Sequence, residues 1–275
     1  MTDKPPAIRA GEIYRHADFP SRQIPTRHVD VWCPPGYAAS GDARYPVLYM
    51  HDGQNLFDPA LSYIGVDWGM DEAMVRLMGE GVSGAIIVGI WNTDKRLCEY
   101  MPQKPLASPK AEKLLPSFVR QYGGLPMSDA YLRFIVDELK PFLDRAYRTL
   151  PWREHTFIMG SSMGGLVSLY ALCEYPNVFG GAGCLSTHWP IGKNLLTAYV
   201  KASLPAPGLH RIYFDYGTET TDATYEPYQR RVDGVMRAAG YREGVDWITR
   251  KYPGAEHSER AWRERVHIPL QFLLA

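Results

Sequence analysis

One stretch of the sequence, residues 156–172, constrains the fold more than any other. It begins with an apolar run of strand length, turns at the small-residue corner Gly160-Ser161-Ser162-Met163-Gly164, and continues with apolar residues at helical spacing. A strand-to-helix corner of this kind holds its serine in a strained, exposed conformation. The first amides of the following helix point toward that serine, where they favour developing negative charge. The pattern therefore predicts a nucleophilic serine at residue 162.

Length and charge limit what surrounds this corner. A chain of 275 residues can bury one large α/β core, and we expect a single domain over residues 1–275. The 30 basic and 30 acidic side chains balance, so we expect neither nucleic acid nor a membrane surface as a partner. No apolar leader opens the sequence and no run approaches the ~20 apolar residues of a membrane span. These features predict a cytoplasmic protein that acts on a small or neutral substrate.

Strand and helix patterns alternate along the chain. Residues 11–19 and 26–33 predict an antiparallel, half-buried pair, because apolar and polar residues alternate in the second. Later apolar runs predict buried parallel strands, at 46–51, 84–91, 181–186, 211–216 and 247–252 in addition to the one before Ser162. Helices are expected at 67–78, 128–143, 192–203, 226–239 and 258–274. The alternation predicts an α/β fold, with helices on both faces of one mostly parallel sheet.

Two segments are less regular. Residues 101–126 are rich in Pro, Lys and Gly and have no clear period, which is typical of a lid, a binding loop or a locally mobile excursion. Residues 92–100 predict a polar loop in which Arg96, Glu99 and Tyr100 lie close together. An internal ion pair that shapes this loop, or a contact with substrate, would explain these three residues.

A serine nucleophile needs a histidine base that is oriented by an acid. In this fold class the acid comes first and the histidine second, each in a loop at the carboxyl end of a strand. Among the late histidines, only His257 follows the last predicted strand in a loop. The acid loop, residues 217–222, contains Glu219 and Asp222, between which spacing does not choose, and Asp215 is the weakest candidate because it lies within the preceding strand.

The turn His51-Asp52-Gly53-Gln54 directly follows the predicted strand 46–51. Glycine there permits unusual backbone dihedrals and leaves amides exposed at the carboxyl end of the sheet. A hydrolase of this type takes a second oxyanion donor from such a turn, whereas a plain Asp/Asn-stabilised turn is the alternative interpretation. Together with the serine corner, the pattern favours the oxyanion donor.

The turn at 51–54, the corner at 160–165 and His257 together resemble the Putative esterase family of α/β-hydrolases, from Arg27 to the C-terminus. That family includes feruloyl, acetyl-xylan and enterochelin esterases, esterase D-type hydrolases and mycolyltransferases. The resemblance implies Ser162 as nucleophile and His257 as general base. It also implies Asp222 as the acid, since Thr221-Asp222 occupies the place of a Leu-Asp pair, with Glu219 in reserve. The amides of Gln54 and Met163 are implied as the oxyanion hole.

These residues predict a serine esterase that acts through an acyl-enzyme, with no metal or organic cofactor. The family resemblance favours a small or carbohydrate-linked ester as its substrate. An acyltransferase to a sugar or other alcohol is one alternative, and a non-catalytic binding module on the same scaffold is another. The substrate-binding candidates lie near the carboxyl edge of the predicted sheet, where core packing would explain them equally well: Trp68, Trp91, Tyr100, His188 and Trp189.

Overall fold

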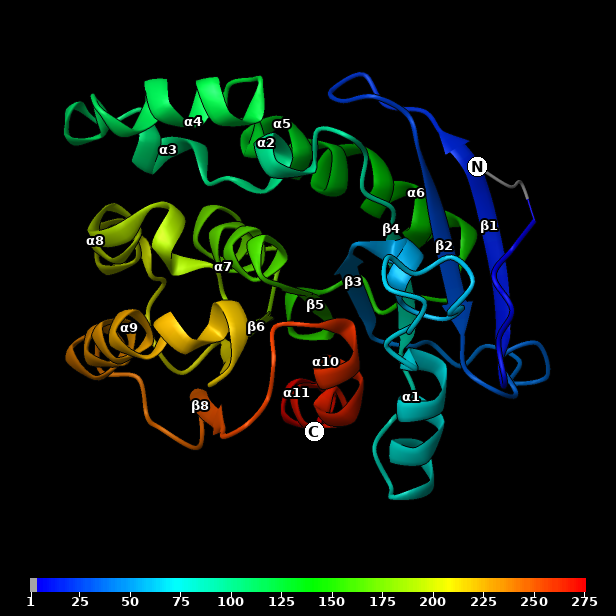
Figure 1. The fold of residues 1–275 in the computed structure, drawn as a ribbon. Helices are drawn as coiled ribbons and strands as arrows, with labels where there is room; N and C mark the ends of the chain where they lie inside the picture. Colours follow the sequence, from blue (N-terminus) through cyan, green and yellow to red (C-terminus); the bar gives the residue numbers. More distant parts are fainter. Residues whose placement is uncertain (1–3) are drawn as a thin grey trace.

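An eight-stranded mixed sheet runs through the computed structural model, which describes residues 4–275 (Figure 1). The strands are β1 (Glu12–Phe19), β2 (Arg27–Cys33), β3 (Val47–His51), β4 (Ile86–Ile90), β5 (Thr156–Ser161), β6 (Gly181–Leu185), β7 (Arg211–Gly217) and β8 (Trp247–Tyr252). Their spatial order is β1-β2-β4-β3-β5-β6-β7-β8. The first two strands pair antiparallel with their neighbours, and all pairs from β4 to β8 are parallel. The predicted sheet, mostly parallel with an antiparallel N-terminal edge, is confirmed.

Helices cover both faces of this sheet and form two apolar cores. One core lies beneath α1 (Met70–Gly79), α10 (Glu259–Arg265) and α11 (His267–Leu274). The larger core lies beneath α5 (Ser128–Arg133), α6 (Lys140–Ala146), α7 (Met163–Glu174), α8 (Lys193–Ser203) and α9 (Glu226–Ala238). Because both faces are covered, β3, β4 and β5 are buried along their whole length, in agreement with their continuous apolar sequences.

The second strand corrects one expectation. Every residue of β2 is buried, so the strand is not half-buried as its alternating pattern suggests. Asp30 on its polar face is fully buried because Arg15 holds it with two hydrogen bonds of 2.8 Å and the Trp91 indole donates a third at 2.7 Å. Alternation of polar and apolar residues identifies the two faces of a strand. It does not reveal that an ion pair and a tryptophan cover the polar face.

The segment 101–126 is helical rather than irregular. It contains α3 (Gln103–Leu106), the short helix η2 (Pro109–Ala111) and α4 (Leu114–Tyr122), which lie along one end of the molecule near α8 (Figure 1). Leu106, Ala111 and Phe118 attach it to the larger core. The segment expected as a polar loop likewise contains a helix, α2 (Arg96–Tyr100).

Prolines divide two of the predicted helices. In the first, a π-helical turn, η3 (Phe134–Leu139), separates α5 from α6, because Pro141 has no N–H for the carbonyl of Asp137. In the second, the C-terminal helix breaks at Val266 into α10 and α11, and Pro269 cannot donate to the carbonyl of Arg265.

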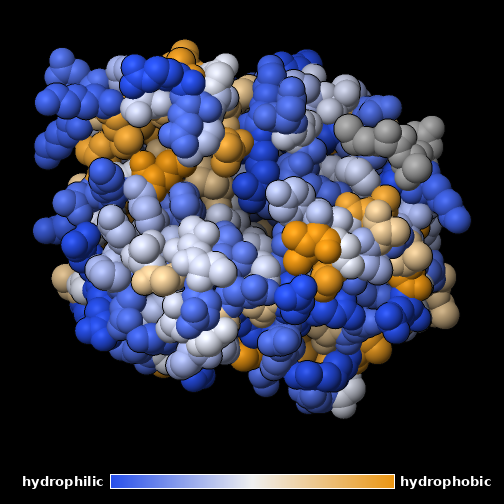
Figure 2. All heavy atoms as spheres, in the orientation of Figure 1, coloured by the Kyte–Doolittle hydropathy of each residue, from blue (hydrophilic) through white to orange (hydrophobic). Residues whose placement is uncertain are grey.

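The outer surface is mostly hydrophilic on the face shown in Figure 2, which is hollowed near its middle. No helix within residues 4–275 is long and apolar enough to cross a membrane.

The backbone of β4 lies so close to the turn after β3 that adding one methyl group at Gly53 should destabilise the fold. A Cβ at Gly53 would lie 2.4 Å from the carbonyl carbon of Gly89, so we expect Gly53→Ala to destabilise the fold by about 2 to 3 kcal/mol. The matched control is Gly234→Ala in the exposed middle of α9, where no atom lies within 4 Å and we expect stabilisation by about 0.5–1 kcal/mol. Urea unfolding measures both. Equal stabilities for the two variants would contradict the tight contact.

Candidate active site

Ser162 occupies a strained backbone conformation between β5 and α7. Its φ of 58° and ψ of −119° lie in a region that non-glycine residues rarely adopt. Two hydrogen bonds hold it there: the Ser162 amide donates to the Leu185 carbonyl at 2.9 Å, and the His188 amide donates to the Ser162 carbonyl at 3.1 Å. The neighbouring strand β6 therefore imposes a conformation that the serine itself disfavours.

The helix after Ser162 approaches its strand closely. A Cβ on Gly160 would lie 3.0 Å from both the carbonyl carbon of Gly164 and Cδ2 of His51. Only glycine leaves room for this approach, which directs the first amides of α7 past the serine.

His257 and Asp222 are joined by a hydrogen bond of 2.6 Å between Nδ1 and Oδ1. They lie in the loops that follow β8 and β7. The Asp222 side chain is fully buried, whereas that of His257 is 15% exposed. Since the carboxylate accepts, Nδ1 carries the proton and Nε2 is left as the basic nitrogen.

The Asp222 carboxylate has donors on both oxygens. Its Oδ2 accepts from the Ser186 hydroxyl and from the Gly217 amide, each at 2.6 Å. Burial alone would raise the pKa of Asp222, but the hydrogen bonds from His257, Ser186 and Gly217 outweigh it, so this pKa lies below its ordinary value. Asp222 is therefore a stable anion next to His257.

The other two acids considered from the sequence lie elsewhere. Glu219 is exposed at the start of the short helix η6 (Thr220–Thr224). Asp215 is fully buried and accepts two hydrogen bonds of 3.0 Å from Arg265. Of the three acids, Asp222 is the one in contact with His257.

A supporting layer, which the sequence did not reveal, lies beneath Asp222. The Ser186 hydroxyl that donates to Asp222 accepts from the Trp262 indole at 3.0 Å and from Arg265 at 2.9 Å. The Ser186 amide donates to Asp215 at 3.0 Å. The sequence does place Ser186 directly after β6, at the edge of the sheet where the site lies, and this position could have marked it as a site residue. Nothing in the sequence marks Arg265, because an arginine in a helix usually faces solvent.

The turn after β3 is fixed by a buried ion pair. Asp52, with a φ of 57°, accepts from Nε and a terminal nitrogen of Arg96 at 2.7 Å each, and from the Asn92 side chain at 2.6 Å. Burial would raise the pKa of Asp52, but Arg96 and Asn92 lower it below its ordinary value. Arg96 thus pairs with Asp52, while Glu99 pairs with Arg27. An ion pair that shapes this region was expected, but its partners come from other segments.

Two helix starts face the region of the serine. Gln54 lies in the first turn of η1 (Gly53–Asn55), and Met163 is the first residue of α7. Amides at such positions have no acceptor within their own helix. The Gln54 side chain is held by the Asn92 amide, which donates to its Oε1 at 3.2 Å.

Ser162 and His257 line the same cavity, of about 430 Å³. The remaining lining residues are Asp52, Gln54, Asn55, Tyr63, Ile64, Asn92, Arg96, Ser161, Ser258, Glu259 and Trp262. Tyr63 and Ile64 are exposed at its rim. Glu259 is 8% exposed, and burial raises the pKa of its carboxyl group. The cavity combines a polar wall with an apolar edge.

Most of the aromatic residues suggested as substrate contacts are packed in the interior. Trp68, Trp91, Tyr100 and Trp189 are at most 7% exposed, and none lines this cavity. They have structural partners: Trp68 packs on Trp262, the Trp91 indole donates to Asp30, the Tyr100 hydroxyl accepts from the Asp52 amide, and the Trp189 indole donates to Gln229. His188 is partly buried against Tyr225.

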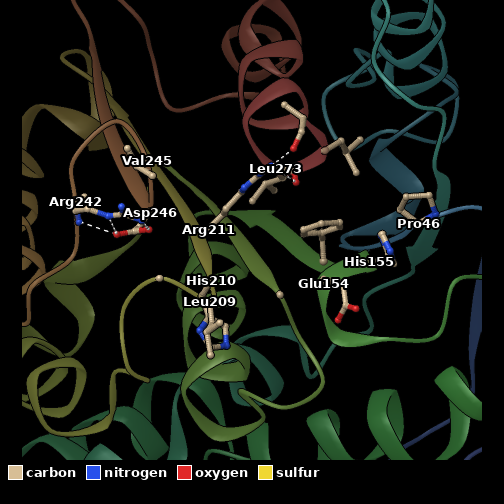
Figure 3. Close-up of a pocket in the computed structure, with 15 residues that line it drawn as sticks. Pro46, Glu154, His155, Leu209, His210, Arg211, Arg242, Val245, Asp246 and Leu273 are labelled. Atoms are coloured by element: carbon tan, nitrogen blue, oxygen red, sulfur yellow. Dashed lines mark hydrogen bonds and ion pairs between the residues drawn. The ribbon is translucent and has the colours of Figure 1, made fainter.

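A second cavity, of about 450 Å³, lies at the opposite edge of the sheet (Figure 3). It is lined by residues at the amino ends of strands, among them Pro46, Phe157 and Arg211. Arg211 donates to the Leu273 carbonyl near the end of α11, and Arg242 pairs with Asp246. It shares no lining residue with the cavity of Ser162.

The sequence matches the Putative esterase family over residues 25–268, and the chain belongs to this family. It is therefore an esterase by class. Among curated relatives, YbbA of Bacillus subtilis, an uncharacterised protein, is 25% identical over 70% of this chain and 68% of its own. The ferri-bacillibactin esterase BesA of the same organism is 31% identical, but the match spans 54% of this chain and half, 50%, of BesA.

Solved structures show the same fold at low sequence identity. An IroE-like serine hydrolase from Shewanella oneidensis has a TM-score of 0.71 and 23% identity, covering 95% of this chain and 80% of its own. A ferulic acid esterase has a TM-score of 0.68 and 19% identity, covering 97% and 99%. The predicted α/β-hydrolase fold and the resemblance to the Putative esterase family are confirmed.

The buried Asp52–Arg96 pair predicts a pH-dependent loss of stability. Arg96→Met leaves Asp52 without its cation, so we expect destabilisation by roughly 2 to 4 kcal/mol at pH 7. With Arg96 present, the folded-state pKa of Asp52 is lowered, so the ion pair stabilises the fold above the ordinary carboxyl pKa and loses this effect as pH falls through the lowered value. In the variant, Asp52 becomes protonated as the pH falls, so the free-energy cost of burying an unpaired carboxylate disappears.

The stability difference between wild type and Arg96→Met should therefore shrink toward pH 3. Lys95→Met, at an exposed neighbouring position, is the control and should change stability by less than about 0.5 kcal/mol. Urea unfolding at pH 7, 5 and 3 measures this. A difference that does not change with pH would contradict the assigned ion pair.

Proposed function

We propose that the protein hydrolyses carboxylic esters through an acyl-enzyme on Ser162. His257 is the general base, Asp222 orients it, and the amides of Gln54 and Met163 bind the oxyanion. The observation that carries the proposal is the combination of Ser162 in a strained strand-to-helix turn with the Asp222–His257 pair, Ser162 and His257 both lining one cavity. Membership of the Putative esterase family supports the same chemistry.

The reaction has two symmetrical halves. His257 Nε2 accepts the Ser162 proton as Oγ attacks the ester carbonyl, and then returns the proton to the leaving alcohol. Water, deprotonated by the same nitrogen, attacks the acyl-enzyme, and Ser162 Oγ leaves with the proton. Asp222 stays ionised throughout, in agreement with its lowered pKa, and stabilises the imidazolium in both halves.

The cavity supports an ester with both polar and apolar parts. Its volume, about 430 Å³, suits a small molecule or the end of a larger one. Arg96, Asn55 and Glu259 offer hydrogen bonds to hydroxyl groups, and Trp262 and Ile64 offer apolar surface. We therefore propose a small or carbohydrate-linked ester. Structural neighbours that support an ester substrate include a ferulic acid esterase and an enterobactin and salmochelin hydrolase.

The choice of Asp222 rather than Glu219 as the acid that orients His257 can be tested by kinetics. We expect Asp222→Asn to lower kcat for p-nitrophenyl acetate by about 10³-fold or more, because the amide favours the wrong tautomer of His257. The matched control is Glu219→Gln in the same loop, whose exposed side chain should leave kcat within about twofold. Ser162→Ala should lose at least about 10⁴-fold. Full activity in Ser162→Ala, or equal losses in the two acid variants, would overturn the assignment.

Added alcohol separates hydrolysis from acyl transfer. We expect the free acid to remain the main product when glycerol or a sugar is added to an assay with acetyl, feruloyl and longer acyl esters. The products are measured by liquid chromatography and mass spectrometry. A transfer product that replaces the acid at millimolar alcohol would show an acyltransferase instead.

A further inference from the structure

Glu259 is an acid in the wall of the Ser162 cavity, and no cation of the protein pairs with it among residues 4–275. It is the first residue of α10 and is 8% exposed. The one side-chain hydrogen bond that its carboxylate accepts among these residues comes from Asn55 Nδ2 and is 3.3 Å long. Burial raises the pKa of this carboxyl group, as expected for a charge with few donors. Glu259 is therefore a nearly buried acid that the fold leaves without a counter-ion.

The other charged groups of the cavity wall are matched. Asp52 and Arg96 also line the cavity, but two hydrogen bonds of 2.7 Å join them, so the pair adds little net charge. His257 donates to the buried Asp222 and is neutral in the role of general base. When Glu259 is ionised, the described wall thus carries one uncompensated negative charge. A cation in the cavity would remove the free-energy cost of this buried, unpaired carboxylate.

Aromatic rings line the same cavity. Trp262 follows Glu259 on α10, and Tyr63 lies at the rim with 85% of its surface exposed. Asn55 connects this rim to the acid, because its Nδ2 donates to Glu259 while its Oδ1 accepts from the Tyr63 amide at 3.0 Å. An aromatic face attracts an ammonium group, and a carboxylate compensates its charge. The cavity therefore offers both kinds of group that bind an ammonium ion.

We propose that Glu259 is a specificity-determining residue, which selects esters that carry an ammonium group, and that the rings of Tyr63 and Trp262 flank this group. The inference rests on the proposed function, because Ser162 lines the same cavity of about 430 Å³. An ester with its carbonyl at Ser162 places its ammonium group against Glu259. A hydroxyl group there would donate a hydrogen bond but would leave the charge uncompensated.

Two pairs of esters test the selection, since the members of each pair have the same shape and differ by one charge. The first pair is acetylcholine and its neutral analogue with a tert-butyl group in place of trimethylammonium. The second is p-nitrophenyl butyrate with the same two groups at the end of the acyl chain. In at least one pair we expect kcat/KM to be about tenfold higher for the cationic ester. Equal or lower values for the cationic ester in both pairs would overturn the proposal.

Glu259→Gln removes the charge and keeps an oxygen that accepts from Asn55. We expect the ratio of kcat/KM between the cationic and the neutral ester to fall from about ten to below about two. A general loss of activity cancels in this ratio. The matched control is Glu264→Gln, which removes the same charge from an exposed position of α10 outside the cavity and should keep the wild-type ratio. An unchanged ratio in Glu259→Gln would contradict the role of Glu259.

Tyr63→Leu tests the aromatic part of the proposal. We expect it to lower the same ratio about threefold, because a cation beside an exposed ring is attracted only moderately. An unchanged ratio would remove Tyr63 from the proposed site. Thermal unfolding checks every variant, and Glu259→Met, which also lacks the charge, replaces Glu259→Gln if that variant does not fold.

Choline binding provides a readout that does not need catalysis. In titrations followed by NMR spectroscopy of the protein, we expect the Kd for choline to be about tenfold lower in the wild type than in Glu259→Gln. The Kd for its neutral tert-butyl analogue should be the same in both proteins. If Ser162→Ala is inactive but the wild type prefers neither cationic esters nor choline, only the substrate class is wrong. If Ser162→Ala hydrolyses esters at the wild-type rate, the proposed function is wrong, and choline binding still decides whether Glu259 binds ammonium groups.

Discussion

The candidate site depends on the buried carboxylate of Asp222. A fully buried anion is costly unless its oxygens have donors, and here His257 contacts one oxygen while Ser186 and the Gly217 amide donate to the other. These donors come from the carboxyl ends of β6, β7 and β8, so hydrogen bonds to one carboxylate hold three loops together. The position of His257, and with it the basic nitrogen that the proposed chemistry needs, follows from this network.

Most of the strained backbone conformations also lie at the carboxyl edge of the sheet. Within residues 4–275, six non-glycine residues have positive φ, and four of them are Asp52, Ser162, Ser186 and Thr220. Each lies in a loop that follows a parallel strand, and each has hydrogen-bonded neighbours that hold it in place. The buried pairs Asp52–Arg96 and Asp215–Arg265 strengthen this edge, because moving either loop would leave a charge uncompensated. The scaffold is thus rigid where the proposed chemistry occurs.

Sequence reasoning predicted the features that are local in the chain. The serine corner and the parallel strands depend on neighbouring residues, and the parallel direction of β5, β7 and β8 then brings the loops of Ser162, Asp222 and His257 to the same edge of the sheet. Features that depend on tertiary packing were missed. Trp91 and Trp189 lie in loops at the carboxyl edge but are buried, and their indoles donate to Asp30 and Gln229. Arg265 supports Ser186 from the last turn of α10, a helix that carries no motif. Residues 101–126 form helices through burial of Leu106 and Phe118, which composition does not reveal.

The most direct test of the account is to locate the covalent intermediate. A slowly hydrolysed aryl ester would be mixed with the enzyme, the reaction quenched in acid within the first turnover, and the acyl group mapped by peptide mass spectrometry. The account predicts one acyl group, on Ser162 rather than on the adjacent Ser161, formed at the rate of alcohol release. An acyl group on another residue, or alcohol release without any acylated protein, would contradict it.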